Sequence, residues 1–333
     1  MSDFDAPLFF EPLPFERVWG GNHLAALFGK PFPQGKVIGE SWELSDRPGA
    51  ESIVAWGPCA GLTLREVLAR HPEEMYGTLA HGERFPLLVK YVDAGTALSV
   101  QVHPDDAGAR SFGDAGKNEC WVVVRAAPGA QIVRGLKAGV TRADFERAVD
   151  AQNVEPLLHS FSPNVGDVVA LPAGTVHAIG AGLVVAEIQQ NSDLTFRIYD
   201  YNRLGLDGKP RALHIKEALS AIRFDGPGDE IAGDMRADTV APAERHETWA
   251  MLRERLVNGK YFDLERLTIR VPGPFEIEGR QGVPRVCMLL EGAVTIAGQR
   301  VTAGSTGLIP AACTDFTIHV VEAPAVWLFS RPH

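Results

Sequence analysis

The chain has 333 residues, of which 45% are hydrophobic and 22% charged, a composition typical of a globular protein large enough for two packed domains. Its formal net charge of −10 disfavours binding to phosphate backbones, so we exclude a nucleic-acid partner. No segment offers the roughly 20 uninterrupted apolar residues that span a bilayer, and we therefore exclude a membrane partner. The acidic N-terminus lacks the features of a secretory signal, which predicts a cytoplasmic protein with four reduced, mostly buried cysteines.

Short apolar or alternating runs separated by Gly, Pro, Asn and Asp dominate the chain from Val37 onward. This pattern favours a β-sandwich or β-barrel over alternating strands and helices. The predicted strands are residues 52–56, 87–92, 120–124 and 167–171. Residues 63–70 and 141–149 have a helical pattern, with Thr63 as the cap of the first and with Thr141 and Asp144 suited to the first turn of the second.

A polar, glycine- and proline-containing stretch from Gly226 to Arg245 precedes a second strand-rich region, residues 261–329. We place the boundary near 225–245 and predict two domains, residues 1–230 and 231–333. Residues 165–177 also align with 303–315, which predicts a duplicated β module. Two polar residues of the first copy, Glu119 and His177, belong to the candidate site described in the next paragraph. In this alignment His177 corresponds to Asp315, and pairing Cys120 with Cys287 sets Glu119 against Val286. The second copy therefore lacks both side chains.

Four side chains in the first region form a candidate metal site. Gln101 and His103 are two residues apart on a predicted strand, so both side chains point to the same face. Glu119 and His177 lie at turn or strand positions further along and complete a set of two oxygen and two nitrogen ligands. Each alone could be a hydrogen-bonded structural residue, but together they suit Zn²⁺ or a similar divalent ion with a position left open.

Several motifs resemble those of type I mannose-6-phosphate isomerase (phosphomannose isomerase). They are LSVQVHPDD at 98–106, GKNECW at 116–121, LPAGTVH at 171–177 and SDLTFR at 192–197, with VWGG at 18–21 and GESWELS at 39–45 in support. The resemblance spans roughly residues 8 to 220. It implies a mostly β fold of two cupin-type β-barrel (jelly-roll) domains with a few short helices, in the compact bacterial form. It also implies a zinc-dependent aldose–ketose isomerase that interconverts mannose 6-phosphate and fructose 6-phosphate through a cis-enediol.

The resemblance also assigns roles to individual residues. It makes Gln101, His103, Glu119 and His177 the ligands of one zinc ion, and it makes Arg197 the catalytic arginine. It places Lys90, Ser99 and Lys117 at the sugar phosphate, and Glu187 at the position of a proton-transferring carboxylate.

Some assignments have alternatives. We expect burial near Val184 and Val185 to raise the pKa of Glu187, as a catalytic base requires, but this residue could instead pair with a surface cation. Arg197 could be an ion-pair partner of Asp193 or Asp200.

Two other functions share the same pattern. One is a non-catalytic cupin that binds a sugar or a metal, and the other is a cupin dioxygenase. The dioxygenase needs an iron site, usually with His and carboxylate ligands, which Gln101 and the two lysines fit poorly. The donor set accepts Zn²⁺, Mn²⁺ or Co²⁺, and the sequence predicts no oligomeric state.

Overall fold

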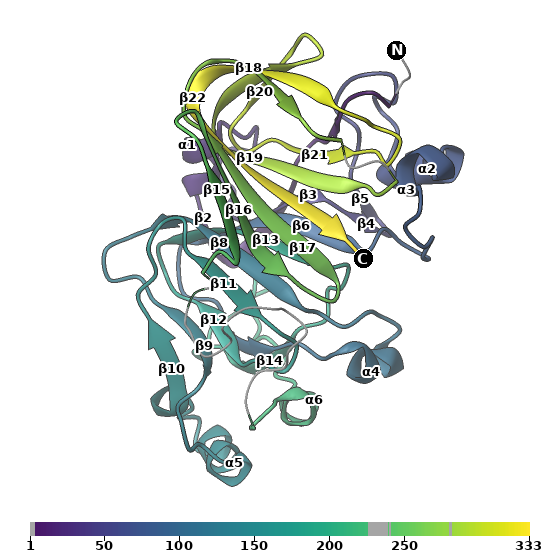
Figure 1. The fold of residues 1–333 in the computed structure, drawn as a ribbon. Helices are drawn as coiled ribbons and strands as arrows, with labels where there is room; N and C mark the ends of the chain where they lie inside the picture. The colour runs from purple at the N-terminus through teal and green to yellow at the C-terminus, as the bar shows by residue number, and fades with distance from the viewer. Residues whose placement is uncertain (1–3, 226–238, 240, 280–281) are drawn as a thin grey trace.

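The computed structural model describes residues 4–225, 239, 241–279 and 282–333 (Figure 1). The predicted boundary between residues 230 and 231 lies outside the described residues. Within the described ranges, no helix is long and apolar enough to cross a bilayer. The four cysteines are reduced and buried, as predicted.

Three large sheets and one small one make up the fold. A six-stranded sheet has the order β11-β8-β13-β6-β2-β3 and a five-stranded sheet the order β10-β9-β12-β7-β14. The strands of the six-stranded sheet are β2 (Leu13–Gly21), β3 (Ile38–Leu44), β6 (Leu87–Ala94), β8 (Glu119–Ala126), β11 (Val168–Leu171) and β13 (Leu183–Gln190). Those of the five-stranded sheet are β7 (Val100–Val102), β9 (Ile132–Leu136), β10 (Leu158–Phe161), β12 (His177–Ile179) and β14 (Phe196–Tyr199).

The third large sheet contains nearly all of the C-terminal strands and one N-terminal strand, because β1 pairs with β21. Its strands are β1 (Leu8–Phe9), β15 (Glu244–Glu247), β16 (Met251–Asn258), β17 (Phe262–Ile269), β18 (Gly273–Ile277), β19 (Arg285–Ile296), β20 (Gln299–Thr302), β21 (Thr306–Ile309) and β22 (Phe316–Pro332). The short strands β4 (Asp46–Arg47) and β5 (Ala50–Glu51) form the small sheet.

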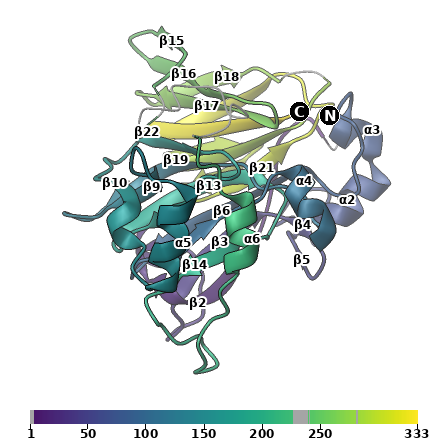
Figure 2. The same ribbon diagram turned by 90° about the horizontal axis from the view of Figure 1, so that it is seen from below.

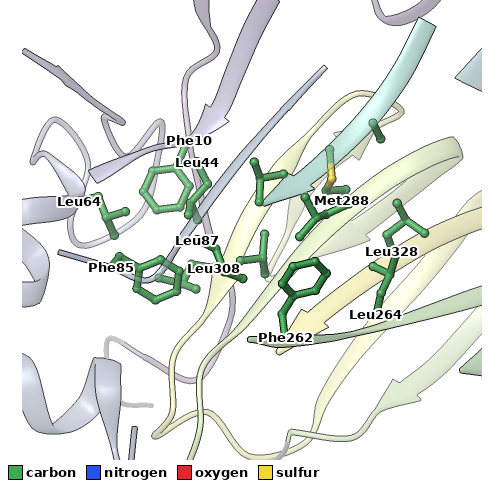
Figure 3. Close-up of a cluster of buried hydrophobic side chains, with 14 of the residues drawn as sticks. Phe10, Leu44, Leu64, Phe85, Leu87, Phe262, Leu264, Met288, Leu308 and Leu328 are labelled. Carbon is green, nitrogen blue, oxygen red and sulfur yellow. The ribbon is translucent and has the colours of Figure 1, made fainter. Parts of the chain in front are cut away.

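The six-stranded sheet is the middle layer of the molecule and is buried on both faces. Side chains alternate along a strand, so Leu87, Val89 and Tyr91 of β6 point to one face while Lys90 and Val92 point to the other. The first face packs against the C-terminal sheet in one apolar cluster. Figure 3 shows residues of both parts of this cluster, Phe10, Leu44, Leu64, Phe85 and Leu87 with Phe262, Leu264, Met288, Leu308 and Leu328. The second face turns toward the five-stranded sheet, with Trp121, Val185 and Ile179 among the residues between them.

The helices are short and lie around the sheets. They are α1 (His23–Phe28), α2 (Leu64–Arg70), α3 (Pro72–Tyr76), α4 (Asp106–Ala109), α5 (Arg142–Asp150) and α6 (Ile215–Ala221), with 3₁₀ turns at Arg110–Phe112 and Glu155–Leu157. Residues of α5 and α6 cover the outer face of the five-stranded sheet, where Phe145 and Ala218 pack on Val100, Val102 and neighbouring side chains (Figure 2). Thr63 caps α2, as the sequence predicts, and Thr141 and Asp144, which were expected in the first turn, form the capping box of α5.

The predicted mostly β fold class is confirmed, although its sheets pack as open layers and do not close into barrels. The strands predicted at 87–92, 120–124 and 167–171 are confirmed by β6, β8 and β11. The strand predicted at 52–56 is wrong. There Val54 and Ile53 form only isolated bridges, to Phe10 and Thr63, so no continuous partner strand extends the pairing.

Two details of the second region also differ from the sequence interpretation. Strand β15 begins at Glu244, inside the stretch expected to be a polar linker. The strand register sets Leu171 opposite Glu119 and Ile309 opposite Arg285. Since Leu171 and Ile309 correspond in the alignment, the counterpart of Glu119 is Arg285 and not Val286. Either residue leaves the second copy without this ligand.

Candidate active site and metal centre

The expected metal ligands come from two facing sheets. Gln101 is in β7 and His177 begins β12, and the two residues are register partners in the five-stranded sheet. His103 directly follows β7, and Glu119 begins β8 in the six-stranded sheet. Alternation along the strands points the polar side chains between the sheets, while Val100, Val102 and their neighbours pack outward under the helices.

The donor atoms converge at short distances. Nε2 of His177 lies 3.3 Å from Glu119 Oε1, and Nε2 of His103 lies 3.6 Å from Glu119 Oε2. One ligand atom from each of these three residues lies within 4.8 Å of the others. The amide nitrogen of Gln101 is 3.2 Å from His177 Nε2. A half turn of the amide would present Oε1 there, since its two ends have nearly the same shape.

Backbone carbonyls fix both imidazoles in the orientation that a metal requires. Nδ1 of His103 donates to the Leu194 carbonyl at 2.7 Å, and Nδ1 of His177 donates to the Thr175 carbonyl at 2.8 Å. This leaves the Nε2 lone pair of each ring facing Glu119. Burial lowers the pKa of His103 well below its usual value and the pKa of His177 to about 4, so both rings are neutral.

This arrangement fits a divalent cation. Two neutral imidazoles and a carboxylate, all buried, point acceptor atoms at one another, and among the described residues Oε1 of Glu119 has no hydrogen-bond partner. Two imidazole nitrogens and a carboxylate gathered in this way are a donor set that suits a divalent cation. His103, Glu119 and His177, with Gln101 beside them, are therefore the residues that would hold the metal.

Two lysines neutralise the buried carboxylates next to the donors. The ammonium of Lys117 lies 2.9 Å from Glu119 Oε2 and 3.0 Å from His103 Nε2. The ammonium of Lys90 lies 3.1 Å from Glu187 Oε1, and Lys117 lies 3.7 Å from the same oxygen. The indole of Trp121 donates to the other oxygen of Glu187 at 2.8 Å.

The pKa expected for Glu187 is wrong in direction. Burial alone raises it, as anticipated, but the attraction of Lys90 and Lys117 outweighs burial and lowers the pKa of Glu187. For Glu119, burial and repulsion by Glu187 outweigh Lys117 and raise the pKa. The two facing carboxyls thus differ, and Glu187 is the one held ionised.

A cavity of about 300 Å³ opens beside the donor set. Its wall includes Ser99, Gln101 and Trp121, the carboxylates Glu40, Glu187 and Asp193, and five cations, Arg17, Lys90, Lys117, Arg197 and Arg211. The abundance of positive charge in one pocket of an acidic chain indicates an anionic ligand.

Arg197 lies in β14, whose register sets it opposite Gln101. It donates to the Ala212 carbonyl at 2.8 Å, and its side chain lines the cavity. Within the described part of the chain its buried Nε has no hydrogen-bond partner, and it forms no ion pair with Asp193 or Asp200. Asp200 is instead paired with Arg203 at 2.6 Å and Arg211 at 3.5 Å. The charge of Arg197 is therefore not neutralised by either of these carboxylates.

Comparison with known proteins agrees with this geometry. The family model "Phosphomannose isomerase type I, catalytic domain" matches residues 11–122. The chain is 36% identical over 337 residues to the probable mannose-6-phosphate isomerase GmuF of Bacillus subtilis, covering 98% of this chain and 99% of that protein. It belongs to the type I phosphomannose isomerase family.

Solved structures extend the similarity to the whole fold. The crystal structure of the mannose 6-phosphate isomerase from Bacillus subtilis superposes with a TM-score of 0.86 at 31% identity, over 98% of this chain and 99% of that one. The structure of a putative mannosephosphate isomerase from Archaeoglobus fulgidus superposes with a TM-score of 0.75 at 24% identity, covering 99% of both chains. The second likeness concerns the fold alone.

In this phosphomannose isomerase family member, all nine residues singled out in the sequence lie at the donor set or on the cavity wall. Sequence reasoning missed Arg17, Glu40 and Arg211. Arg17 and Glu40 lie beside or within the segments at 18–21 and 39–45 that supported the resemblance, so a signal was present. Arg211 comes from an irregular loop, and its place in the cavity depends on tertiary packing.

Proposed function

We propose that this chain is a zinc-dependent, cytoplasmic mannose-6-phosphate isomerase that interconverts mannose 6-phosphate and fructose 6-phosphate. The observation on which this proposal depends is the convergence of two neutral imidazoles and a carboxylate beside a cationic cavity. The names of the family model and of the similar isomerases support the same reaction. We propose one zinc ion per chain, held by Gln101, His103, Glu119 and His177.

The reaction moves a proton between C2 and C1 of the open-chain sugar, with an enediolate between the two states. We assign the base to Glu187, which is held ionised and is oriented by the Trp121 indole. Its carboxylate takes the proton from C2 of the aldose, the C–H electrons form the C1=C2 bond, and the electrons of the C1=O double bond move onto O1. The hydroxyl proton on O2 passes to O1, the O2 electrons form the C2=O bond, and the C1=C2 electrons take the proton back from the carboxyl group at C1.

Charge on the substrate oxygens requires a fixed donor. Arg197 lines the cavity, and a guanidinium stays charged at any pH of interest, so we assign it to the enediolate oxygens. A bound Zn²⁺ would add Lewis-acid stabilisation of the same negative charge.

The phosphate end of the substrate has several cationic partners. Lys90, Ser99 and Lys117 all line the cavity, and we retain them as contacts to the sugar phosphate. Arg17 and Arg211 add two guanidinium groups, which bind phosphate oxygens through paired hydrogen bonds. An acidic chain thereby provides a local binding site for a dianion.

The proposal is tested with the purified protein in a coupled assay for fructose 6-phosphate. We expect turnover of mannose 6-phosphate that is lost on chelation and restored by Zn²⁺. In deuterated solvent we expect deuterium at the carbon that receives the proton.

We expect Arg197→Gln to lower kcat by about 10²–10³-fold, as is typical when one preorganised donor is removed. The matched control is Arg300→Gln, which removes an exposed arginine of strand β20 in the C-terminal sheet. Zinc-loaded protein that forms no fructose 6-phosphate would refute the function.

A further inference from the structure

One carboxylate, Asp106, connects the C-terminal part of the chain to the metal-site loop. It begins α4, three residues after His103. Its Oδ2 accepts a hydrogen bond from the Tyr261 hydroxyl at 2.9 Å. Its Oδ1 accepts from the backbone N–H of Gly116 at 2.9 Å and from the side-chain amide of Gln190 at 3.1 Å. Three distant segments therefore share one acceptor group.

The hydrogen bonds continue from Asp106 to the backbone around Glu119. Oε1 of Gln190 accepts from the backbone N–H of Asn118 at 3.0 Å and from its side-chain amide at 2.7 Å. Oδ1 of Asn118 accepts from the backbone N–H of Ala173 at 2.9 Å, four residues before His177. The backbone N–H of Lys117 donates to the Pro104 carbonyl at 2.9 Å, next to His103. The segments that bear all three clustered ligands are thus tied together.

Close packing makes this connection stiff. A Cβ atom at Gly116 would lie 2.4 Å from the Asp106 nitrogen and 2.6 Å from the Asp105 carbonyl carbon, so the backbones touch at this glycine. Asn118 and Gln190 are buried. A shift of Asp106 is therefore transmitted to the loop that precedes Glu119.

Tyr261 is itself held by the C-terminal sheet. It directly precedes β17, its carbonyl accepts from the backbone N–H of His333 at 3.0 Å, and its ring packs against the cluster shared by the two sheets. Building on the function proposed above, we propose that Tyr261 is a positioning residue for the metal ligands and acts through Asp106. The C-terminal region, whose described residues contain no such ligand set, in this way sets the geometry of the site in the first region.

Substituting Tyr261 by Phe removes the hydroxyl and keeps the ring packing. We expect Tyr261→Phe to weaken the Zn²⁺ affinity of the metal-free protein by roughly 3–10-fold. This is less than the 10–100-fold typical of groups that contact a ligand directly, because Tyr261 acts from further away. The affinity is measured by competition with a chromophoric chelator, alongside kcat, KM and the midpoint of thermal unfolding.

Tyr91→Phe is the matched control, because the Tyr91 hydroxyl is buried and has no hydrogen-bond partner in the described residues. Its Zn²⁺ affinity should equal that of the unchanged protein. Tyr261→Phe with control-like Zn²⁺ affinity, whatever its thermal stability, overturns the proposal, because the hydroxyl then only stabilises the packing of the two regions.

Asp106 provides a second, independent comparison should Tyr261→Phe fail to fold. Asp106→Asn keeps an oxygen for Gly116 and Gln190 and gains an N–H for the Tyr261 hydroxyl, so its Zn²⁺ affinity should stay near that of the unchanged protein. Asp106→Ala should lose about tenfold or more. Equal affinities in the two variants overturn the proposal.

Protein that binds Zn²⁺ but does not isomerise mannose 6-phosphate would refute the proposed function and leave this inference standing.

Discussion

At the scale of single residues, each buried lysine beside the donor set is paired with a carboxyl group. Lys90 lies against Glu187 and Lys117 against Glu119, and both clustered histidines are neutral. Such pairing avoids the large cost of an unpaired ion in the interior. A divalent cation at Glu119 would share its oxygens with the Lys117 ammonium, so the two cations compete.

This competition predicts the behaviour of Lys117→Met. Methionine fills the volume without charge, so the variant should bind Zn²⁺ at least as tightly as the unchanged protein. Loss of a charged contact to substrate should raise KM for mannose 6-phosphate by roughly tenfold or more. Zinc content by metal analysis and steady-state kinetics test both statements, with Lys36→Met, an exposed lysine paired with Glu16, as the control. A zinc-depleted Lys117→Met protein would contradict the expectation.

Glu40 makes a measurable, pH-dependent contribution to stability. Burial raises its pKa, but Lys90, Arg17 and the Trp42 indole outweigh burial and lower the pKa from 4.5 to about 2. A lowered folded-state pKa stabilises the protein above the unfolded value and loses that effect as the pH falls toward the folded value. The difference in unfolding free energy between the unchanged protein and Glu40→Gln should therefore shrink by roughly 2 kcal/mol between pH 6 and pH 3. Urea titrations of both proteins at each pH measure it, and a constant difference would disprove the assignment.

At the scale of secondary structure, short-range signals predicted elements well and long-range pairings poorly. Strands β6, β8 and β11 were identifiable because burial on both faces leaves nearly continuous apolar runs. Thr63 was identifiable as a cap because a capping box involves only four consecutive residues. The segment 52–56 has strand-like composition, yet its bridge partner Phe10 lies more than forty residues away, and composition contains no information on that pairing.

The same distinction between short-range and long-range information applies to the candidate site. His103, Glu119 and His177 were identifiable from local motifs, and their mutual distances follow from two sheets facing each other. The pKa of Glu187 depends on two lysines that reach it from β6 and from the loop before β8, so burial alone gave the wrong direction.

The cap of α2 offers a test at this scale. The helix buries Leu64, Val67 and Leu68 in the cluster between the sheets, so fraying of its first turn disturbs the core. Thr63→Ala removes the side-chain acceptor for the Glu66 N–H and should lower the free energy of unfolding by about 1 kcal/mol. Thr63→Ser retains the hydroxyl and should restore most of the loss in denaturant titrations. An equal loss in both variants would show that the methyl group, not the cap, matters.

At the scale of the whole molecule, the packing of the two predicted regions is continuous. The N-terminal strand β1 pairs with β21 of the C-terminal sheet, and one apolar cluster joins Leu87 and Val89 to Leu264 and Met288. The division of the chain into domains at residues 1–230 and 231–333 remains a prediction. The cores of the two regions are continuous.

A chain ending at residue 225 should therefore fail to fold. It would expose the face of the six-stranded sheet that carries Leu87, Val89 and Tyr91, which is an apolar surface of the kind that drives aggregation. Size-exclusion chromatography and far-ultraviolet circular dichroism should show aggregated or unfolded material, and co-expression of residues 241–333 should rescue it. A monomeric, cooperatively unfolding fragment of residues 1–225 would contradict this expectation.

Burial of the middle sheet on both faces limits how the enzyme can be altered. In β6, Lys90 lines the cavity. Val89 and Tyr91, the residues on either side of it, pack in the cluster between the six-stranded sheet and the C-terminal sheet. Substitutions in β6 that adapt the cavity to a different sugar would also disturb the packing between the six-stranded sheet and the C-terminal sheet. A change at Thr195, which lines the cavity from the segment just before β14, is the safer starting point for redesign.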